Sequence, residues 1–377
     1  MDFSRLGRYL DELARARVPG CDIAVFHDHE LIYRHMAGFR DYEHREHMRG
    51  DETYCLYSCT KVITTCALMQ LIEKGLIHPD DPVSDYLPAF SDMTVREGGR
   101  LVRCRRTMTI RHLMSMQSGM DYEKEAPEIL AFLEQRGGHA STREVVDLMA
   151  SRPLCFEPGT DFLYSLSHDV LGAVIEVVTG KSFSQVLKEQ IFEPLGLKTI
   201  GFWLQEKELK RQCAQYEFQD ETQTFMELPA AMNDYMLSDR YESGGAGLMS
   251  DVHDYSLFAD VIACGGETAD GKRILNPETI QLWRSNQLMP KSRKSFDEWN
   301  RTGYSYGLGV RTRVDLSIGG PGSLGEFGWD GAAGAWTMID PSLCLSAFYA
   351  MHVKNYGYCY DVIHSTVRGL IYEGFYA

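Results

Sequence analysis

The sequence predicts an α+β fold, an α/β sandwich in which helices flank an antiparallel sheet built from both chain termini. Two observations support it. β-rich runs occur near the start and in the last third of the chain, and helical periodicity fills most of the middle. A chain of 377 residues can bury a large core and form two parts. We expect a sheet-containing part over 1–85 plus 245–377, an inserted mostly helical part over 86–244, and an active site in the cleft between them.

The N-terminal segment predicts a helix, a hairpin and a second helix. Apolar residues recur at helical spacing over 3–17, and Pro19-Gly20 then breaks the pattern. Residues 21–39 contain two β-rich runs that meet at 27–29. The segment after Lys61 leaves little polar face, which is typical of a buried central helix.

The rest of the chain changes character near its C-terminal third. Residues 80–240 contain mostly helical stretches, and another helix is predicted at 250–266 after the glycine-rich turn SGGAG. Successive antiparallel strands and a final helix are then predicted at 304–314, 323–330, 335–340, 343–353 and 360–375.

Composition narrows the classes of function. A net charge of −15 disfavours a nucleic-acid partner, because phosphates would repel it. The chain has no run of 18 apolar residues and its start has no apolar signal core, so neither a membrane span nor a signal peptide is expected. Ten cysteines without C-x-x-C pairs are typical of a reducing compartment. We expect a cytoplasmic protein with a small-molecule substrate, whose oligomeric state the sequence leaves open.

Several histidines are candidate metal ligands. HDHE (27–30) lies at the predicted hairpin tip, and HREH (44–47) lies in the loop that follows. Such polar side chains in turns are more often solvated than metal-bound. His112 and His168 adjoin predicted helices, where a structural role is the simpler interpretation. The sequence therefore predicts no metal and no cofactor.

Ser58 and Lys61 form a Ser-x-x-Lys pair where the long apolar helix begins. Residues three apart lie on one face of a helix. Ser58 would also lie at the positive end of the helix dipole, which suits a nucleophile that must face an oxyanion. Burial of a lysine lowers its pKa and favours a neutral amine that can accept the serine proton. An N-capping serine and a solvated lysine would give the same spacing.

Two further motifs supply what such a pair needs. Tyr164 lies in a loop ahead of a helix, and a tyrosine near a lysine ammonium has a depressed pKa and can shuttle a proton. In GWDGAAG (328–334), Gly331 would let backbone approach a ligand closely. The N–H of Ala332 could pair with that of Ser58 to form an oxyanion hole.

These motifs, in this order, resemble the serine β-lactamase and penicillin-binding-protein superfamily. The resemblance covers nearly the whole chain and is closest to class C β-lactamases, D-alanyl-D-alanine carboxypeptidases and family VIII carboxylesterases. TIRHLMSMQSGM (109–120) and IFEPLGLKTIGF (191–202) look like other landmarks of this superfamily. The resemblance implies a β-lactamase/transpeptidase-like fold and a covalent acyl-enzyme. By the same resemblance, Ser58 is the nucleophile, Lys61 its base and Tyr164 the proton relay.

Two positions depart from the β-lactamase pattern. Leu166 stands where those enzymes have an asparagine that holds the acylamido side chain, and Trp329-Asp330-Gly331 replaces a motif whose cation attracts the substrate carboxylate. Trp329 offers an apolar wall and one N–H donor, while Asp330 would repel a carboxylate if it faced the cleft. We predict these four residues as substrate-binding positions, in a carboxylesterase that acts on small neutral esters.

Other functions stay open from the sequence. A D-Ala-D-Ala carboxypeptidase or amidase, or a β-lactamase, would use the same catalytic residues, and a catalytically silent binding protein could keep the fold. PGSLG (321–325) nearly matches a nucleophile elbow, but it lacks the first glycine and precedes a strand, which disfavours an α/β-hydrolase. The cleft walls are expected from 120–140 and 205–240, which do not identify the acyl or alcohol portion.

Overall fold

The structure, a computed structural model, describes residues 1–229, 233–299 and 301–377. Residues 230–232, which belong to the predicted wall segment 205–240, lie outside the described residues. The main sheet has eight strands in the order β11-β12-β13-β14-β15-β1-β2-β3, and its pairs are antiparallel. At its centre β1 (Gly20–His27) pairs with β15 (Leu345–Ala350), so strands from both ends of the chain lie side by side. The predicted sheet is confirmed.

The remaining strands extend this sheet in both directions, mostly through short connections. They are β2 (Glu30–Asp41), β3 (Glu46–His47), β11 (Tyr304–Tyr306), β12 (Arg311–Arg313), β13 (Phe327–Gly328) and β14 (Trp336–Asp340). The single strand predicted at 304–314 is wrong, because β11 and β12 pair with each other as a hairpin. Gly309 has a φ of 77°, a conformation that favours glycine, and the N–H of Gly307 donates to the carbonyl oxygen of Val310.

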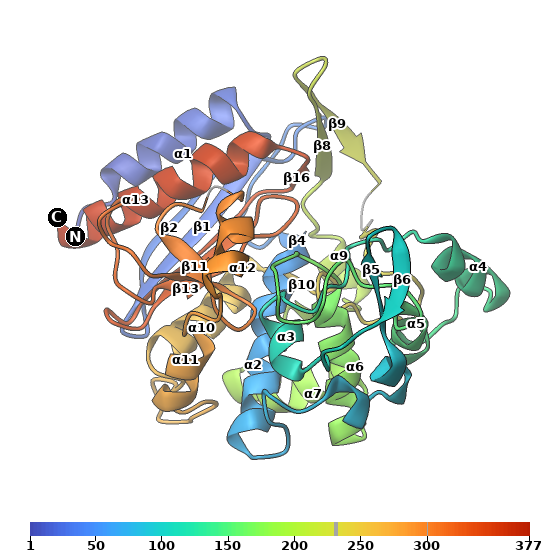
Figure 1. The fold of residues 1–377 in the computed structure, drawn as a ribbon. Coiled ribbons are helices and arrows are strands. Elements are labelled where there is room, and N and C mark those ends of the chain that lie inside the picture. Colours follow the sequence, from blue (N-terminus) through green and yellow to red (C-terminus); the bar gives the residue numbers. More distant parts are fainter. Residues whose placement is uncertain (230–232, 300) are drawn as a thin grey trace.

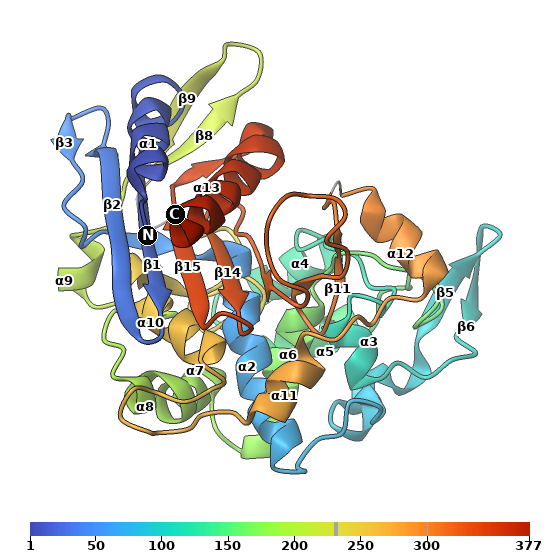
Figure 2. The ribbon, with the colours of Figure 1, turned by 90° about the vertical axis from the view of Figure 1, so that its left-hand side faces the viewer.

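Helices cover both faces of the sheet (Figures 1 and 2). On one face lie α1 (Ser4–Ala16) and α13 (His364–Tyr376), which pack against each other and place the two termini close together. The apolar stripe of α1 is buried there, as its helical spacing predicts. On the other face α10 (Val252–Ala263) packs against β1 and β15.

Helix α2 (Thr60–Glu73) is the central helix of the second layer. It follows a 3-10 turn at Tyr57–Cys59, and all of its residues from Thr60 to Leu71 are buried. It contacts α6 (Ser167–Thr179), α7 (Phe183–Leu187) and α11 (Pro277–Trp283). Because neighbours surround it, the helix needs no polar face, and the predicted buried central helix is confirmed.

The middle of the chain contains mostly helices, together with small sheets. The other helices of the chain are α3 (Ile110–Met114), α4 (Pro127–Gln135), α5 (Thr142–Met149), α8 (Glu193–Leu195), α9 (Glu206–Leu209) and α12 (Pro290–Asp297). The small sheets are formed by β4 (Thr53–Cys55), β5 (Thr94–Glu97), β6 (Arg100–Arg103), β7 (Ile200–Gly201), β8 (Gln215–Gln219), β9 (Thr224–Leu228), β10 (Met249–Asp251) and β16 (Val353–Lys354). The pairs β10–β7 and β16–β8 connect the middle of the chain to its C-terminal part. The division of the chain into a sheet-containing part over 1–85 plus 245–377 and an inserted part over 86–244 stays a prediction.

Two expectations from composition can be compared with the fold. All ten cysteines are free thiols. Over the described ranges no single helix has the length and apolarity needed to cross a membrane, although Ser167–Thr179 and Phe183–Leu195, which are bent by 77°, pass that test as a pair.

Candidate active site

Ser58 lies in the 3-10 turn immediately before α2, with Lys61 one turn further along. Nζ of Lys61 lies 3.1 Å from Oγ of Ser58, so the adjacency predicted from their spacing is confirmed. Tyr57, just before the serine, has a φ of 46°, which is unusual for a bulky residue and marks a strained turn. Backbone N–H groups at such a helix start have no acceptor within the helix, and that of Ser58 remains the first predicted oxyanion donor.

Lys61 is fully buried and is held by three oxygen atoms. Besides Ser58, its Nζ lies 2.8 Å from the carbonyl oxygen of Gly245 and 3.3 Å from the hydroxyl of Tyr122. A neutral amine has two N–H donors and one lone pair, so it can donate to Gly245 and Tyr122 while it accepts from Ser58. Burial lowers the pKa of Lys61 to about 7, although the charge of Asp169 acts in the opposite direction. The shift has the direction expected from the sequence.

Asp169, on α6, is a buried acid whose charge acts on Lys61. Its Oδ1 accepts hydrogen bonds from Tyr241 (2.9 Å) and Ser243 (2.7 Å), and burial raises its pKa. A Cβ added to Gly245 would lie 2.7 Å from Asp169 and 3.3 Å from Nζ of Lys61. Glycine in the SGGAG turn therefore lets the backbone pass between the two groups and present its carbonyl to the lysine.

Tyr164 lies beside this pair, in the loop before α6. Nζ of Lys61 is 4.6 Å from the centre of its ring, and its hydroxyl accepts a hydrogen bond of 2.9 Å from Nε1 of Trp329. The expectation of a depressed pKa is wrong: burial raises the pKa of Tyr164 far above its ordinary value, which outweighs the opposing effects of Ser58 and Trp329. Tyr164 is therefore a neutral phenol, suited to donate a proton rather than to act as a phenolate base.

A second tyrosine, which the sequence did not single out, also lies beside Lys61, with its hydroxyl 3.3 Å from Nζ. Tyr122 stacks on Tyr164 with ring centres 5.3 Å apart and contacts Tyr235 edge-on at 5.8 Å. Tyr122 and Tyr235 fall inside the segments expected to form the cleft walls. No local pattern separates them from the other tyrosines of the chain, because only the fold brings them to Lys61.

The loop after β13 forms the opposite side of the site. A Cβ on Gly331 would lie 2.3 Å from the carbonyl oxygen of Leu56, so only glycine allows this loop to pack against the strand end that leads to Ser58. The close approach expected of Gly331 is therefore made to the protein's own backbone rather than to a ligand. Ala332, the next residue, lines the same cavity as Ser58, and its N–H remains the predicted second oxyanion donor.

The cavity at Ser58 has a volume of about 520 Å³ and mainly aromatic walls. Six aromatic side chains line it: Tyr122, Tyr164, Tyr235, Trp299, Trp329 and Tyr360. Gly331 and Ala332 complete one side, and Glu298, Arg301 and Asp330 are the charged members of the lining. Its volume lies within the usual range for small-molecule sites, roughly 300–1,000 Å³.

Comparison with known proteins gives the family. The family model for Beta-lactamase matches residues 6–357, most of the 377-residue chain. The chain belongs to the Beta-lactamase family. It is 28% identical over 342 residues to protein Rv1367c of Mycobacterium tuberculosis, covering 88% of this chain and 84% of that protein. It is 32% identical over 208 residues to esterase EstB of Burkholderia gladioli, covering 53% and 51% of the two chains.

A solved structure agrees with this family assignment. The structure of EstCE1, described as a hydrolase with promiscuous acyltransferase activity, superposes with a TM-score of 0.81 at 25% identity. The superposition covers 97% of this chain and 98% of EstCE1. The β-lactamase/transpeptidase fold predicted from the sequence is thus confirmed.

Asp330 occupies a different electrostatic setting from the one its position in the Beta-lactamase family suggested. Its carboxylate pairs with the guanidinium of Arg301 and lies 3.0 Å from that of Arg311. Burial alone would raise the pKa of Asp330, but the two arginines together hold it below its ordinary value. The expected repulsion of a substrate carboxylate is therefore wrong, because two positive charges already compensate this aspartate.

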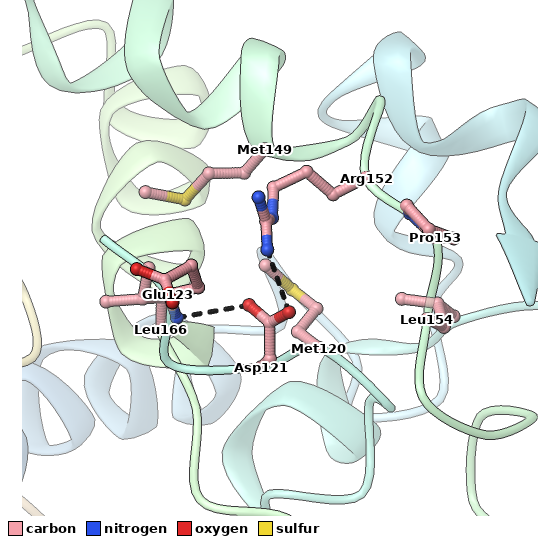
Figure 3. A pocket seen from close by; sticks show the side chains of 8 residues that line it. All are labelled: Met120, Asp121, Glu123, Met149, Arg152, Pro153, Leu154 and Leu166. Carbon is pink, nitrogen blue, oxygen red and sulfur yellow. Dashed lines mark hydrogen bonds and ion pairs between the residues drawn. The ribbon is translucent and has the colours of Figure 1, made fainter. Parts of the chain in front are cut away.

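Leu166 is the other Beta-lactamase motif position that the structure places differently. It is buried at the start of α6 and does not line the Ser58 cavity. Figure 3 shows it instead beside Met149 and Asp121, around a space of only about 10 Å³. Its N–H donates to the carbonyl oxygen of Asp121, whose carboxylate pairs with Arg152 at 2.9 Å. Leu166 thus packs the base of the loop that presents Tyr164 and does not reach a substrate in the cavity.

The two helix-adjoining histidines have structural surroundings. His112 forms a capping box with Thr109 at the start of α3. His168 is buried and lies 3.3 Å from the hydroxyl of Thr65. Neither lines the Ser58 cavity, as the sequence led us to expect.

Proposed function

We propose that this Beta-lactamase family protein is a serine hydrolase with Ser58 as its nucleophile, and that it acts on small neutral carboxylic esters. The observation that supports the nucleophile is the buried Lys61, whose Nζ lies 3.1 Å from Oγ of Ser58 and whose pKa is about 7. Near neutral pH a large fraction of this lysine is an unprotonated amine able to accept the serine proton. An ordinary surface lysine, with a pKa near ~10.4, would be almost fully charged.

The proposed reaction has two steps. Lys61 takes the proton of Ser58 as the serine oxygen attacks the ester carbonyl, and the N–H groups of Ser58 and Ala332 stabilise the negative oxygen. Tyr164 donates its phenolic proton to the leaving alcohol and recovers one from the lysine ammonium. Water then attacks the acyl-enzyme: neutral Tyr164 takes a proton from the water as it passes its own to neutral Lys61. The lysine ammonium returns that proton to the oxygen of Ser58 as the acyl bond breaks, which releases the acid and restores the enzyme.

The preference for esters is inferred from the walls of the cavity. Where related enzymes carry a cation, this chain has Trp329, whose single N–H is engaged by Tyr164. Arg301 is the cation of the described lining, and it is paired with Asp330. Six aromatic rings offer apolar contact to an acyl chain but no charge to a substrate carboxylate. A neutral ester satisfies these walls better than a β-lactam or a peptide that ends in a carboxylate.

The test compares kcat/KM for p-nitrophenyl butyrate and for a chromogenic cephalosporin. We expect the ester to be at least tenfold better, since one missing attraction at ~4 Å amounts to a few kcal/mol at an effective dielectric of ~20. Trp329→His, which returns a titratable cation to this position, should raise the cephalosporin rate relative to the ester at pH 6. Faster turnover of the cephalosporin by the unmodified protein would overturn the esterase proposal while leaving the catalytic residues in place.

Acyl transfer to an alcohol is the second candidate. A cavity of about 520 Å³ exceeds the needs of a short ester, and its aromatic walls could hold an acceptor alcohol beside the acyl-enzyme. EstCE1 is described as a hydrolase with such a promiscuous activity. The test uses p-nitrophenyl butyrate in water with added butanol and measures the ratio of butyl butyrate to butyric acid. Acyl transfer forms butyl butyrate, whereas hydrolysis alone forms only the acid.

A further inference from the structure

Side chains of types that bind metals lie outside the active site, in the turn after β1, in the turn before β15 and at the end of α10. Figure 2 shows the two turns at the same end of the main sheet. His27 at the end of β1 is paired with Leu345 at the start of β15, so the turns that follow β1 and precede β15 are neighbours. The N–H of Asp28 donates to the carbonyl oxygen of Cys344 at 3.0 Å. Cys264 lies directly after α10.

The functional atoms of this cluster form two groups of three that share Cys264. Those of Asp28, Cys264 and Cys344 lie within 4.8 Å of one another. The same limit holds for those of His29, Asp260 and Cys264. Cys264 belongs to both groups and therefore lies at the centre of the cluster. Asp28 is exposed and both thiols are partly exposed, so an ion can reach them.

Three residues of this cluster lie in tight turns. Asp28, His29 and Cys344 have φ values of 49°, 67° and 45°, the left-handed region that favours glycine or asparagine. They are three of eight non-glycine residues with positive φ in the described part of the chain. Asp28 and His29 are the two residues between β1 and β2, and a two-residue hairpin turn commonly takes positive φ at both positions. The turn geometry therefore accounts for these two φ values, and each of the three positions carries a side chain that can bind a metal.

His29 is oriented by a buried carboxylate. Its Nδ1 lies 2.8 Å from Oδ2 of Asp260, and its backbone N–H donates to Oδ1 of the same residue at 3.2 Å. Asp260 is buried on α10. A carboxylate on one ring nitrogen fixes the histidine and leaves the other nitrogen, Nε2, for a metal, which is the common arrangement around zinc.

We propose that Cys264, Cys344, His29 and Asp28 bind one zinc ion, with Asp260 orienting the histidine. Mixed sulfur and nitrogen ligands with one carboxylate match the preference of zinc rather than of magnesium or calcium. Zinc bonds of ~2.0–2.3 Å place tetrahedral ligands roughly 3.3–3.8 Å apart, so side-chain rotations must bring the two groups onto one ion around Cys264. The thiols lose their protons on binding.

This site would tie the two turns to α10 without touching the catalytic residues. The five residues of β14 separate the loop that contains Ala332 from the turn that contains Cys344, a distance of roughly 16 Å along the strand. The sequence alone favoured a solvated turn for HDHE. The two thiols that alter this interpretation come from positions more than 230 residues further along the chain.

The experiment titrates the full-length, chelator-stripped protein with Zn²⁺ against a chromophoric competitor. We expect one zinc per chain with a submicromolar Kd, no response to Mg²⁺, and a rise in Tm of about 3 °C at a free zinc concentration of ~100 Kd. Cys264→Ser and Cys344→Ser should each weaken binding at least ~100-fold. Cys155→Ser removes an exposed thiol elsewhere and should leave the affinity unchanged.

Two measurements separate this proposal from the enzymatic one. Ser58→Ala should bind zinc like the unmodified protein, and Cys264→Ser should keep its hydrolytic turnover, which also shows that it folds. Absence of binding tighter than ~10 μM, or binding that Cys264→Ser leaves unchanged, would overturn the zinc site. So would mass spectrometry that finds Cys264 and Cys344 joined by a disulfide in the freshly isolated protein.

Discussion

Two charged residues are buried at the Ser58 cavity: Lys61 beside Ser58, which we call the floor, and Asp330 in the lining, which we call the wall. Lys61 can lose its charge near neutral pH, whereas Asp330 keeps its charge. On the floor, Lys61 is surrounded by neutral oxygen donors and acceptors, and burial lowers its pKa to about 7. On the wall, Asp330 is buried to a similar degree but lies between two guanidinium groups, which hold its pKa below the ordinary value. Burial alone does not decide whether a group titrates near neutrality; its partners do.

The difference assigns a chemical role to Lys61 and a structural role to Asp330. A buried lysine whose direct contacts are neutral oxygens can lose its proton at little cost and serve as a base. A compensated aspartate stays charged and holds Arg301, and with it the wall, in place. We expect substitutions on the floor to act on rate and substitutions on the wall to act on stability.

The largest effect is expected from removal of the nucleophile on the floor. Ser58→Ala should lower kcat by about 10⁶-fold, the scale measured for a catalytic serine, because no acyl-enzyme can form. The fold should persist, since a buried hydroxyl is exchanged for a methyl group. Burst kinetics and labelling by a fluorophosphonate report on the same residue. Retention of more than a few per cent of turnover, or labelling of the variant, would show that another residue is the nucleophile.

Lys61→Arg tests whether the residue at this position must lose its proton for activity. Arginine keeps its charge at any accessible pH and cannot accept the serine proton, so we expect a loss of about 10²–10⁴-fold in kcat/KM. Lys61→Met, which removes the charge and the base together, serves as the matched control and should lose as much. Robust activity in the arginine variant would show that a neutral Lys61 is not the base, which contradicts the contrast drawn with Asp330.

Asp330→Asn tests the wall. The substitution leaves Arg301 and Arg311 without their counter-charge, and breaking such a buried pair costs about 3–5 kcal/mol of the free energy of unfolding. Urea unfolding measures this loss. Where the variant folds, its freed guanidinium groups should favour the cephalosporin relative to the ester. An unchanged urea midpoint would mean that the wall does not depend on this ion pair.

The smallest effect concerns the pH dependence of the floor. The kcat/KM of the unmodified enzyme should rise with pH as Lys61 loses its proton, with a midpoint near 7. The charge of Asp169 raises the pKa of Lys61, so Asp169→Asn should lower this pKa and move the midpoint down. Glu176→Gln, at a partly buried acid on the same helix outside the cavity, is the control. A midpoint that moves upward would contradict the assignment of the limb to Lys61.

Local pattern was sufficient for much of the fold. The spacing of Leu6, Leu10 and Leu13 predicted α1, and the two β-rich runs around 27–29 predicted the first hairpin. Helix α2 was predicted as buried because it lacks a polar face. The strand predicted at 304–314 failed, because apolar residues continue through a glycine turn and periodicity does not register the reversal.

The sequence by itself determined the fold class and the Ser58–Lys61 pair, because both depend on residues close together in the chain. Hydrophobic periodicity selects helix or strand locally, and a spacing of three places two side chains on one helical face. Tertiary structure alone decided the partners: Tyr122 beside Lys61, Arg311 beside Asp330, and Cys264 beside Cys344. Electrostatic surroundings depend on distance in space, and no local pattern encodes which distant residue will supply the neighbouring charge or ligand.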